Sequence, residues 1–306
     1  MNKKWLVLGS VIGISSLMMV TTGISAMAGT SGYDAYKSAL KNTKTVQSVT
    51  VQAAGSLRDN GNVALSANGT FKMSREGGSA SGSGEVSAGG TKQSLQFYKQ
   101  GDQAIFKPES GDVYFVKEAA AEAHKRFKGS ADKEMPQQVE TVVDALVGNL
   151  KDYVAVDVKG DGSKRVSAEL DGAQLPAVVQ AIAPIVIKQG SKEHRESEKK
   201  KAADTAANPF GHDFLKGVAP ELTDAIRLEK VAVNATISPS NYIQHQEAEL
   251  TVSGKDAGGK THQVVVHLQA DLSGYDSTTP DTVDLNGKNV QKMESEHRNK
   301  WQGKNG

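Results

Sequence analysis

The sequence lacks cysteine altogether among its 306 residues. It can therefore form no disulfide bond, no thiolate zinc site and no thiol nucleophile, and it offers no thiol for a bacterial lipid anchor. Aromatic residues make up only 5% of the chain, so platforms for stacking nucleic-acid bases are scarce. An excess of one charge sign is also missing, because 36 Lys and Arg balance 35 Asp and Glu without a sustained basic face. We therefore exclude nucleic acid as a partner and expect a fold that depends on its hydrophobic core.

One long hydrophobic run is present, and it lies at the N-terminus. Lys3 and Lys4 precede the apolar stretch 5–20, and an A-x-A sequence ends at Ala28. This order of features is typical of a secretory signal peptide, so we expect cleavage after Ala28 and a secreted or cell-surface, extracytoplasmic protein. The alternative is a retained anchor, because the run is nearly long enough to span a bilayer.

Alternation of apolar and polar residues dominates the rest of the chain. In residues 63–73 the odd positions are apolar and the even positions are mostly polar, and residues 49–57 show the same period. Successive side chains of a strand point to opposite faces, so each segment reads as a half-buried strand. The Asn-Gly pair at 60–61 between them is a strong hairpin signal. The pattern returns in 79–117 and 228–272. It predicts an antiparallel sheet with one apolar and one polar face.

Helical periodicity is confined to three segments, at residues 31–44, 135–150 and 173–190. The third is unusually apolar and leads into a charged insertion near 188–213. The arrangement that gives these helices a partner is an α+β fold with a curved antiparallel sheet, an open half-barrel of about 9–11 strands closed by helices on its concave face.

A single domain at 29–286 contains all of these elements. It follows the signal peptide at 1–28 and precedes a polar C-terminal tail at 287–306.

The order of elements resembles a known superfamily. A predicted helix with the sequence YDAYKSALKNTK is followed closely by a strand with the sequence SVTVQAAGSL. Long strands with one polar face come next, then the inserted helices, and then further long strands. This order is similar to that of the half-barrel superfamily of bacterial lipoprotein and lipid carriers, the LolA/LolB and LppX/LprG type. The resemblance implies an open barrel capped by helices, with acyl chains held in the gap between them. The chain departs from the pattern in its greater length, its charged insertion and the absence of the cysteine that anchors some members.

Small residues recur on the predicted apolar face, and they favour a cavity for a hydrophobic ligand. The opposing interpretation is a tightly packed core, since protein interiors normally leave no voids. The candidate ligand contacts are Leu65, Ala67, Gly69, Phe71, Met73, Leu95, Phe97, Val178, Ile182 and Ile185.

Chemical motifs point away from catalysis. Residues 157–169 approach a calcium loop, but Lys159 stands where a carboxylate is needed, so the segment reads as a hairpin turn. The seven histidines are interpreted as surface residues. His245 and His267 could meet across a hairpin as a metal alternative. There is no G-x-S-x-G nucleophile elbow. We expect no catalytic residue, no metal site and no cofactor.

Two functions remain open at this stage. The first is a non-enzymatic carrier or chaperone for a hydrophobic envelope ligand, a lipid or a lipidated protein, bound through its acyl chain. The second is an envelope sensor or structural module that binds another protein through the same fold. Either protein would be peripheral to the membrane at most.

Overall fold

The computed structural model describes residues 31–118, 153–177, 179–181, 183–184, 187 and 217–293. The predicted signal peptide, the helix at 135–150 and the charged insertion lie outside the described residues, as do three candidate ligand contacts, Val178, Ile182 and Ile185. No helix within the described part of the chain combines the length and the apolar character needed to cross a membrane.

The described residues form one helix of thirteen residues, two short 3₁₀ turns and twelve strands. The helix is α3 (Ser31–Thr43), and the 3₁₀ turns are η1 (Glu76–Gly78) and η3 (Gly172–Gln174). The strands are β1 (Ser48–Asp59), β2 (Asn62–Ser74), β3 (Ser79–Ala88), β4 (Thr91–Gln100), β5 (Gln103–Pro108), β6 (Val113–Glu118), β7 (Ala155–Val158), β8 (Lys164–Asp171), β9 (Asp224–Ile237), β10 (Ile243–Lys255), β11 (Thr261–Ser273) and β12 (Asn289–Met293). Helical residues also occur between 177 and 187.

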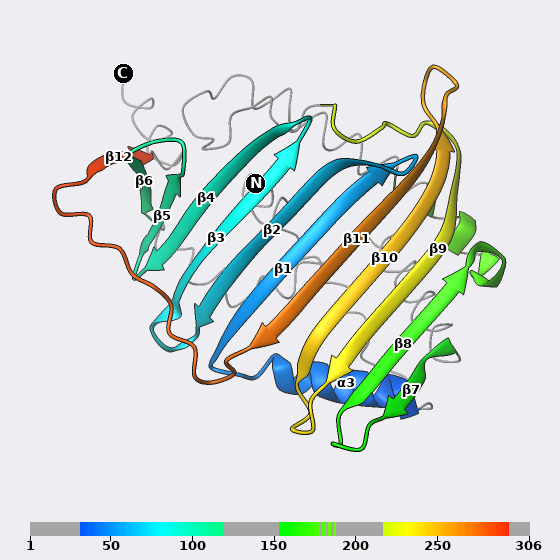
Figure 1. The fold of residues 1–306 in the computed structure, drawn as a ribbon, viewed down its shortest axis with the longest axis horizontal. Coiled ribbons are helices and arrows are strands. Elements are labelled where there is room, and N and C mark those ends of the chain that lie inside the picture. Colours follow the sequence, from blue (N-terminus) through cyan, green and yellow to red (C-terminus); the bar gives the residue numbers. More distant parts are fainter. Residues whose placement is uncertain are drawn as a thin grey trace, which may run out of the picture.

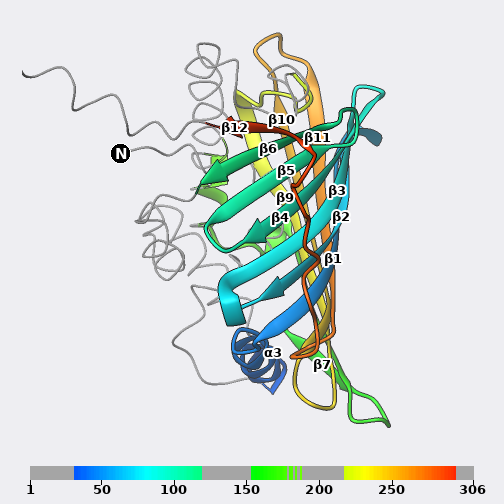
Figure 2. The same ribbon diagram turned by 90° about the vertical axis from the view of Figure 1, so that its left-hand side faces the viewer.

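All twelve strands belong to one sheet, in the order β12-β6-β5-β4-β3-β2-β1-β11-β10-β9-β8-β7 (Figure 1). Neighbouring strands are antiparallel except β12 and β6, which are parallel. The sheet is open, because β12 and β7 are at opposite ends of the order. Figure 2 shows it curving around the side on which α3 lies. The predicted open, curved antiparallel sheet is confirmed, with twelve strands instead of 9–11.

The β1–β2 hairpin forms where the Asn-Gly signal predicts it. Asn60 and Gly61 have φ angles of 49° and 83°, the left-handed values that a tight hairpin turn requires. The alternation then places Val51 opposite Phe71 and Leu57 opposite Leu65, so both strands turn their larger apolar side chains to the same face.

The helix α3 covers one corner of that apolar face. Its buried Ala39 and Leu40 pack in a cluster with Val51, Ile237 and Ile243 of the sheet. We call this group the α3 cluster. The end of the helix is fixed to β10 because the Thr43 hydroxyl donates to the Ala39 carbonyl at 2.8 Å and accepts from the Ile243 amide at 3.0 Å.

A second cluster lies at the opposite ends of β8–β10. Leu175, Val179 and Ala183 pack there with Leu170 and Ile226, among others. Val179 and Ala183 belong to the predicted apolar helix at 173–190, so its described residues contact the apolar face. Within the described residues, helical segments thus contact the sheet in two places, at α3 and between 177 and 187.

The last described residues form a long connection and a short edge strand, which begins within the predicted polar tail at 287–306. Residues 274–288, here called the strap, cross the sheet ends from β11 towards the far edge (Figure 1), and residues 289–293 then form β12, parallel to β6. The sequence does not reveal β12 because four of its five residues are exposed, so burial imposes no alternating pattern on it.

Candidate functional site

Seven candidate ligand contacts lie together on the apolar face of β2 and β4. Cross-strand pairing aligns Phe71 with Gly82 and Phe97, and it aligns Gly69 with Gly84 and Leu95. Directly opposite residues share a face of an antiparallel sheet. The structure therefore brings together Leu65, Ala67, Gly69, Phe71, Met73, Leu95 and Phe97.

These side chains differ in how deeply they are buried. Leu95 is 4% exposed and belongs to a third apolar cluster with Phe106, whose ring lies 5.3 Å from that of Phe97. Met73 packs against the α3 cluster. Leu65, Ala67 and Phe71 are only half-buried.

A strip of half-buried apolar side chains runs across the middle of the sheet, between the clusters. It crosses β2, β1, β11, β10 and β9 through direct pairs such as Leu65 with Leu57 and Leu57 with Val266. None of its members belongs to, or packs against, the three clusters of the described residues. We call it the central apolar strip, and it consists of Leu57, Leu65, Ala67, Phe71, Val233, Ala248 and Val266.

The glycines on this face leave less room than their size implies. A Cβ added at Gly82 would lie 2.6 Å from Cδ1 of Phe71, and one added at Gly69 would lie 2.9 Å from Cε2 of the same ring. A Cβ at Gly55 would lie 2.9 Å from a methyl carbon of Leu268. The Phe71 ring therefore lies over Gly69 of its own strand and Gly82 of the neighbouring strand β3. An aromatic ring over a cross-strand glycine helps to fix the register of a sheet. The space predicted at Gly69 is occupied by that ring.

The two histidines considered for metal binding do not meet. The register pairs His245 with Asp271 and His267 with Glu249, four residues apart along the strand. Each histidine instead contacts a carboxylate on the polar face: His245 Nδ1 lies 2.7 Å from Asp271, and His267 Nε2 lies 2.7 Å from Glu247. Within the described residues, no group of three or more His, Asp and Glu side chains could hold a metal ion.

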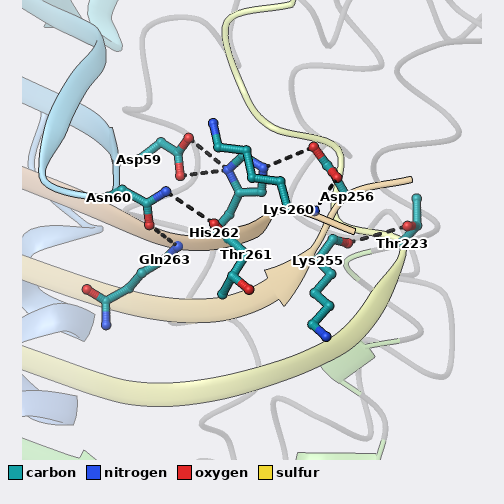
Figure 3. Close-up of polar contacts among 9 residues, drawn as sticks. All are labelled: Asp59, Asn60, Thr223, Lys255, Asp256, Lys260, Thr261, His262 and Gln263. Carbon is teal, nitrogen blue, oxygen red and sulfur yellow. Dashed lines mark hydrogen bonds and ion pairs between the residues drawn. The ribbon is translucent and has the colours of Figure 1, made fainter. Parts of the chain in front are cut away.

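His262 contradicts the interpretation of the histidines as surface residues. It lies on the apolar face, is 5% exposed, and joins two hairpin turns at one end of the sheet (Figure 3). Its Nδ1 lies 2.9 and 2.8 Å from the two oxygens of Asp59, and its Nε2 lies 3.3 Å from Asp256. The sequence did contain a signal for this burial, because His262 continues the apolar series of even positions from Val264 to Leu272.

The electrostatics of this group favour a charged imidazole. Hydrogen bonding to Asp59 raises the pKa of His262, against the opposing effect of burial, and the contact with Asp256 raises it further. The pKa of Asp256 is lowered, first by the Lys260 amide, which donates to it at 2.9 Å, and then by His262. The side chains of Asp59, His262 and Asp256 form what we call the His262 clip. It holds the β1–β2 turn to the β10–β11 turn.

The comparisons with known proteins identify similar structures only. No family model and no curated protein matches the chain. A DUF1329 family protein from Desulfovibrio piger ATCC 29098 is similar at 9% identity over 81% of this chain and 94% of that chain, with a TM-score of 0.21. A LolA superfamily protein from Nitrosomonas europaea is similar at 9% identity over 84% of this chain and 96% of that chain, also with a TM-score of 0.21. The superfamily that the order of elements resembles is thus represented among the similar structures.

Proposed function

We propose that the protein is an exported, non-enzymatic binding protein that holds a hydrophobic ligand, such as the acyl chain of a lipid or of a lipidated protein, against the apolar face of its sheet. The observation that carries the proposal is the central apolar strip. Seven apolar side chains lie on one face across five strands, half-buried and outside the packed clusters of the described residues.

The physical reason is the incomplete burial of this surface. Removing apolar area from water stabilises a complex by roughly 25 cal/mol per Å². An acyl chain that covers the strip would therefore lower the free energy of the complex. Large contiguous apolar areas on a protein surface are typical of interaction sites. Helices that close the concave side, as the resemblance implies, would bury the other side of such a ligand.

The export that this proposal includes rests on the sequence of residues 1–28. A carrier role, as opposed to simple binding, rests on the resemblance in element order. The supporting geometry is the open sheet, which curves around the side on which α3 lies (Figure 2), and α3 packs there against apolar side chains of the sheet.

Native mass spectrometry of the chain purified from its own host tests the proposal. The expected result is a mass above that of the mature polypeptide by the mass of one or more lipids, which organic extraction then releases and identifies. A clean polypeptide mass, with no lipid taken up from added vesicles, would overturn it.

A further inference from the structure

The polar face of the sheet is hollowed on the side opposite the central apolar strip. A groove of about 470 Å³ crosses β11, β1, β2, β3 and β4 there. Five neighbouring strands at a spacing of ~4.8 Å make such a groove about 19 Å long. Its lining includes Gly69 and Gly84, which are directly opposite each other on β2 and β3 and present only backbone atoms to the groove.

Cross-strand register explains the shape of the groove. Two adjacent rows of polar-face positions line it, one running through Gln52 and Thr70, the other through Asn68 and Glu85. Short side chains lie within both rows: Thr70 and Ser83 are neighbours in the first, and Ala54 belongs to the second.

The strap lies over the row next to the groove, nearer the strand ends. Its Asp281 amide donates to the Ser81 hydroxyl at 2.8 Å, and Lys72 donates to the Asp281 carboxylate at 2.9 Å. Ser81 and Lys72 are directly opposite each other and two residues from the groove positions Ser83 and Thr70. The strap therefore lies on the sheet surface along one side of the groove.

The lining has an unusual chemical character. It contains the amides Gln52, Asn68, Gln96 and Gln269, three hydroxyl side chains and three carboxylates, and none of its residues is Lys, Arg or His. Amides both donate and accept hydrogen bonds, and carboxylates accept them in pairs. Such a set of side chains suits ligands whose groups both donate and accept hydrogen bonds. It disfavours anionic ligands, because no lining residue is a cation.

Several lining groups are held in place from outside the groove. Lys92 binds Glu85 at 2.9 Å, and His245 binds Asp271 at 2.7 Å. The Tyr98 hydroxyl donates to Gln96 at 3.1 Å. Each contact uses part of the acceptor capacity of its partner and leaves other lone pairs for a ligand. Groups that are already positioned lose less conformational entropy when they bind.

We infer that this groove is a second binding site, for a neutral, hydroxyl-rich chain such as an oligosaccharide. Vicinal hydroxyls both donate and accept, which is what rows of amides and carboxylates satisfy. An extended chain fits a groove that crosses five strands. The site is independent of the hydrophobic ligand, because it lies on the other face of the sheet.

Titration calorimetry with soluble neutral cello-, malto- and chito-oligosaccharides tests the inference. The variant Gln52→Ala/Asn68→Ala removes two exposed amides from the groove, so its fold should be unaffected. We expect about tenfold or greater loss of affinity, because each removed amide both donates to and accepts from the ligand hydroxyls. Gln263→Ala, an exposed amide of β11 outside the groove, is the matched control and should bind as the native chain does.

Three outcomes would overturn the inference. The first is the absence of binding by every neutral oligosaccharide at millimolar concentration. The second is an equal loss of affinity in the double variant and the Gln263→Ala control. The third is binding of spermine without any oligosaccharide, which would make the groove an acidic patch for polyamines.

Discussion

His262 and Asp59 are 203 residues apart in the sequence, and their side chains meet at 2.8 Å at the end of the sheet. The contact joins the first hairpin of the sheet to the last long one (Figure 3). Because the other ring nitrogen faces Asp256, both imidazole nitrogens donate only when the ring is protonated. The His262 clip is therefore strongest in the imidazolium form.

The first prediction concerns the pH dependence of stability. The folded-state pKa of His262 is raised above its ordinary value of 6.5, so the clip contributes its full stability below pH 6.5 and loses it as the pH rises through the higher folded-state pKa. Urea unfolding across this range should show a falling free energy of unfolding in the native chain. The variant His262→Gln should lack that fall.

A matched control is His245→Gln, which removes a half-buried histidine from the polar face. Its pH profile should follow that of the native chain. If His262→Gln kept the native slope, the clip would not be the source of the pH dependence.

The second prediction concerns the ring that covers the glycines. Gly82→Ala would place a Cβ 2.6 Å from the Phe71 ring and 2.8 Å from the Thr70 carbonyl oxygen, so we expect destabilisation of about 1–3 kcal/mol. In a Phe71→Ala background the ring is gone, and the same substitution should be less damaging by at least about 0.5 kcal/mol. Chemical denaturation of the four members of this double-mutant cycle measures the difference. Strict additivity would show that the ring does not fill the space over Gly82.

The third prediction concerns the strap. Asp281→Ala removes the carboxylate that accepts hydrogen bonds from Lys72 and Ser81. We expect the free energy of unfolding to fall by about 1 kcal/mol, because an exposed ion pair stabilises the fold little beyond its hydrogen bonds. The larger effect should be local, seen as faster proteolysis within 274–288. Asp284→Ala is the control, because its carboxylate bonds only to the nearby Asn286 amide among the described contacts. Equal proteolysis of the two variants would contradict an anchoring role for Asp281.

The parts of the fold that follow from local rules could be predicted from the sequence. The β1–β2 hairpin follows from alternation and an Asn-Gly turn, and α3 from its helical period. The shared face of Leu65, Ala67 and Phe71 also follows, since register and period fix it.

The parts that depend on distant contacts could not be predicted. The strap is held by polar pairs such as Asp281 with Ser81, 200 residues apart, and no local pattern marks them. The space over Gly82 is filled by Phe71 of the neighbouring strand, which only the sheet register brings near. His262 was assigned to the surface because histidine is a polar residue. Its position in the apolar series of β11 indicated burial instead.

The most direct test of ligand binding compares two tryptophans on the same strand. Ala67→Trp projects onto the central apolar strip, whereas Ser66→Trp projects onto the polar face. Ala67 is preferable to Gly69 for this test, because a side chain at Gly69 would meet the Ser83 carbonyl oxygen at 2.7 Å and disturb the sheet.

The measurement is binding of a dansyl-labelled fatty acid, followed by its fluorescence, to the native chain and to both folded variants. We predict that Ala67→Trp lowers the affinity at least about tenfold, while Ser66→Trp binds like the native chain. Equal affinity in all three proteins, or no binding to any, would contradict a hydrophobic site on the apolar face.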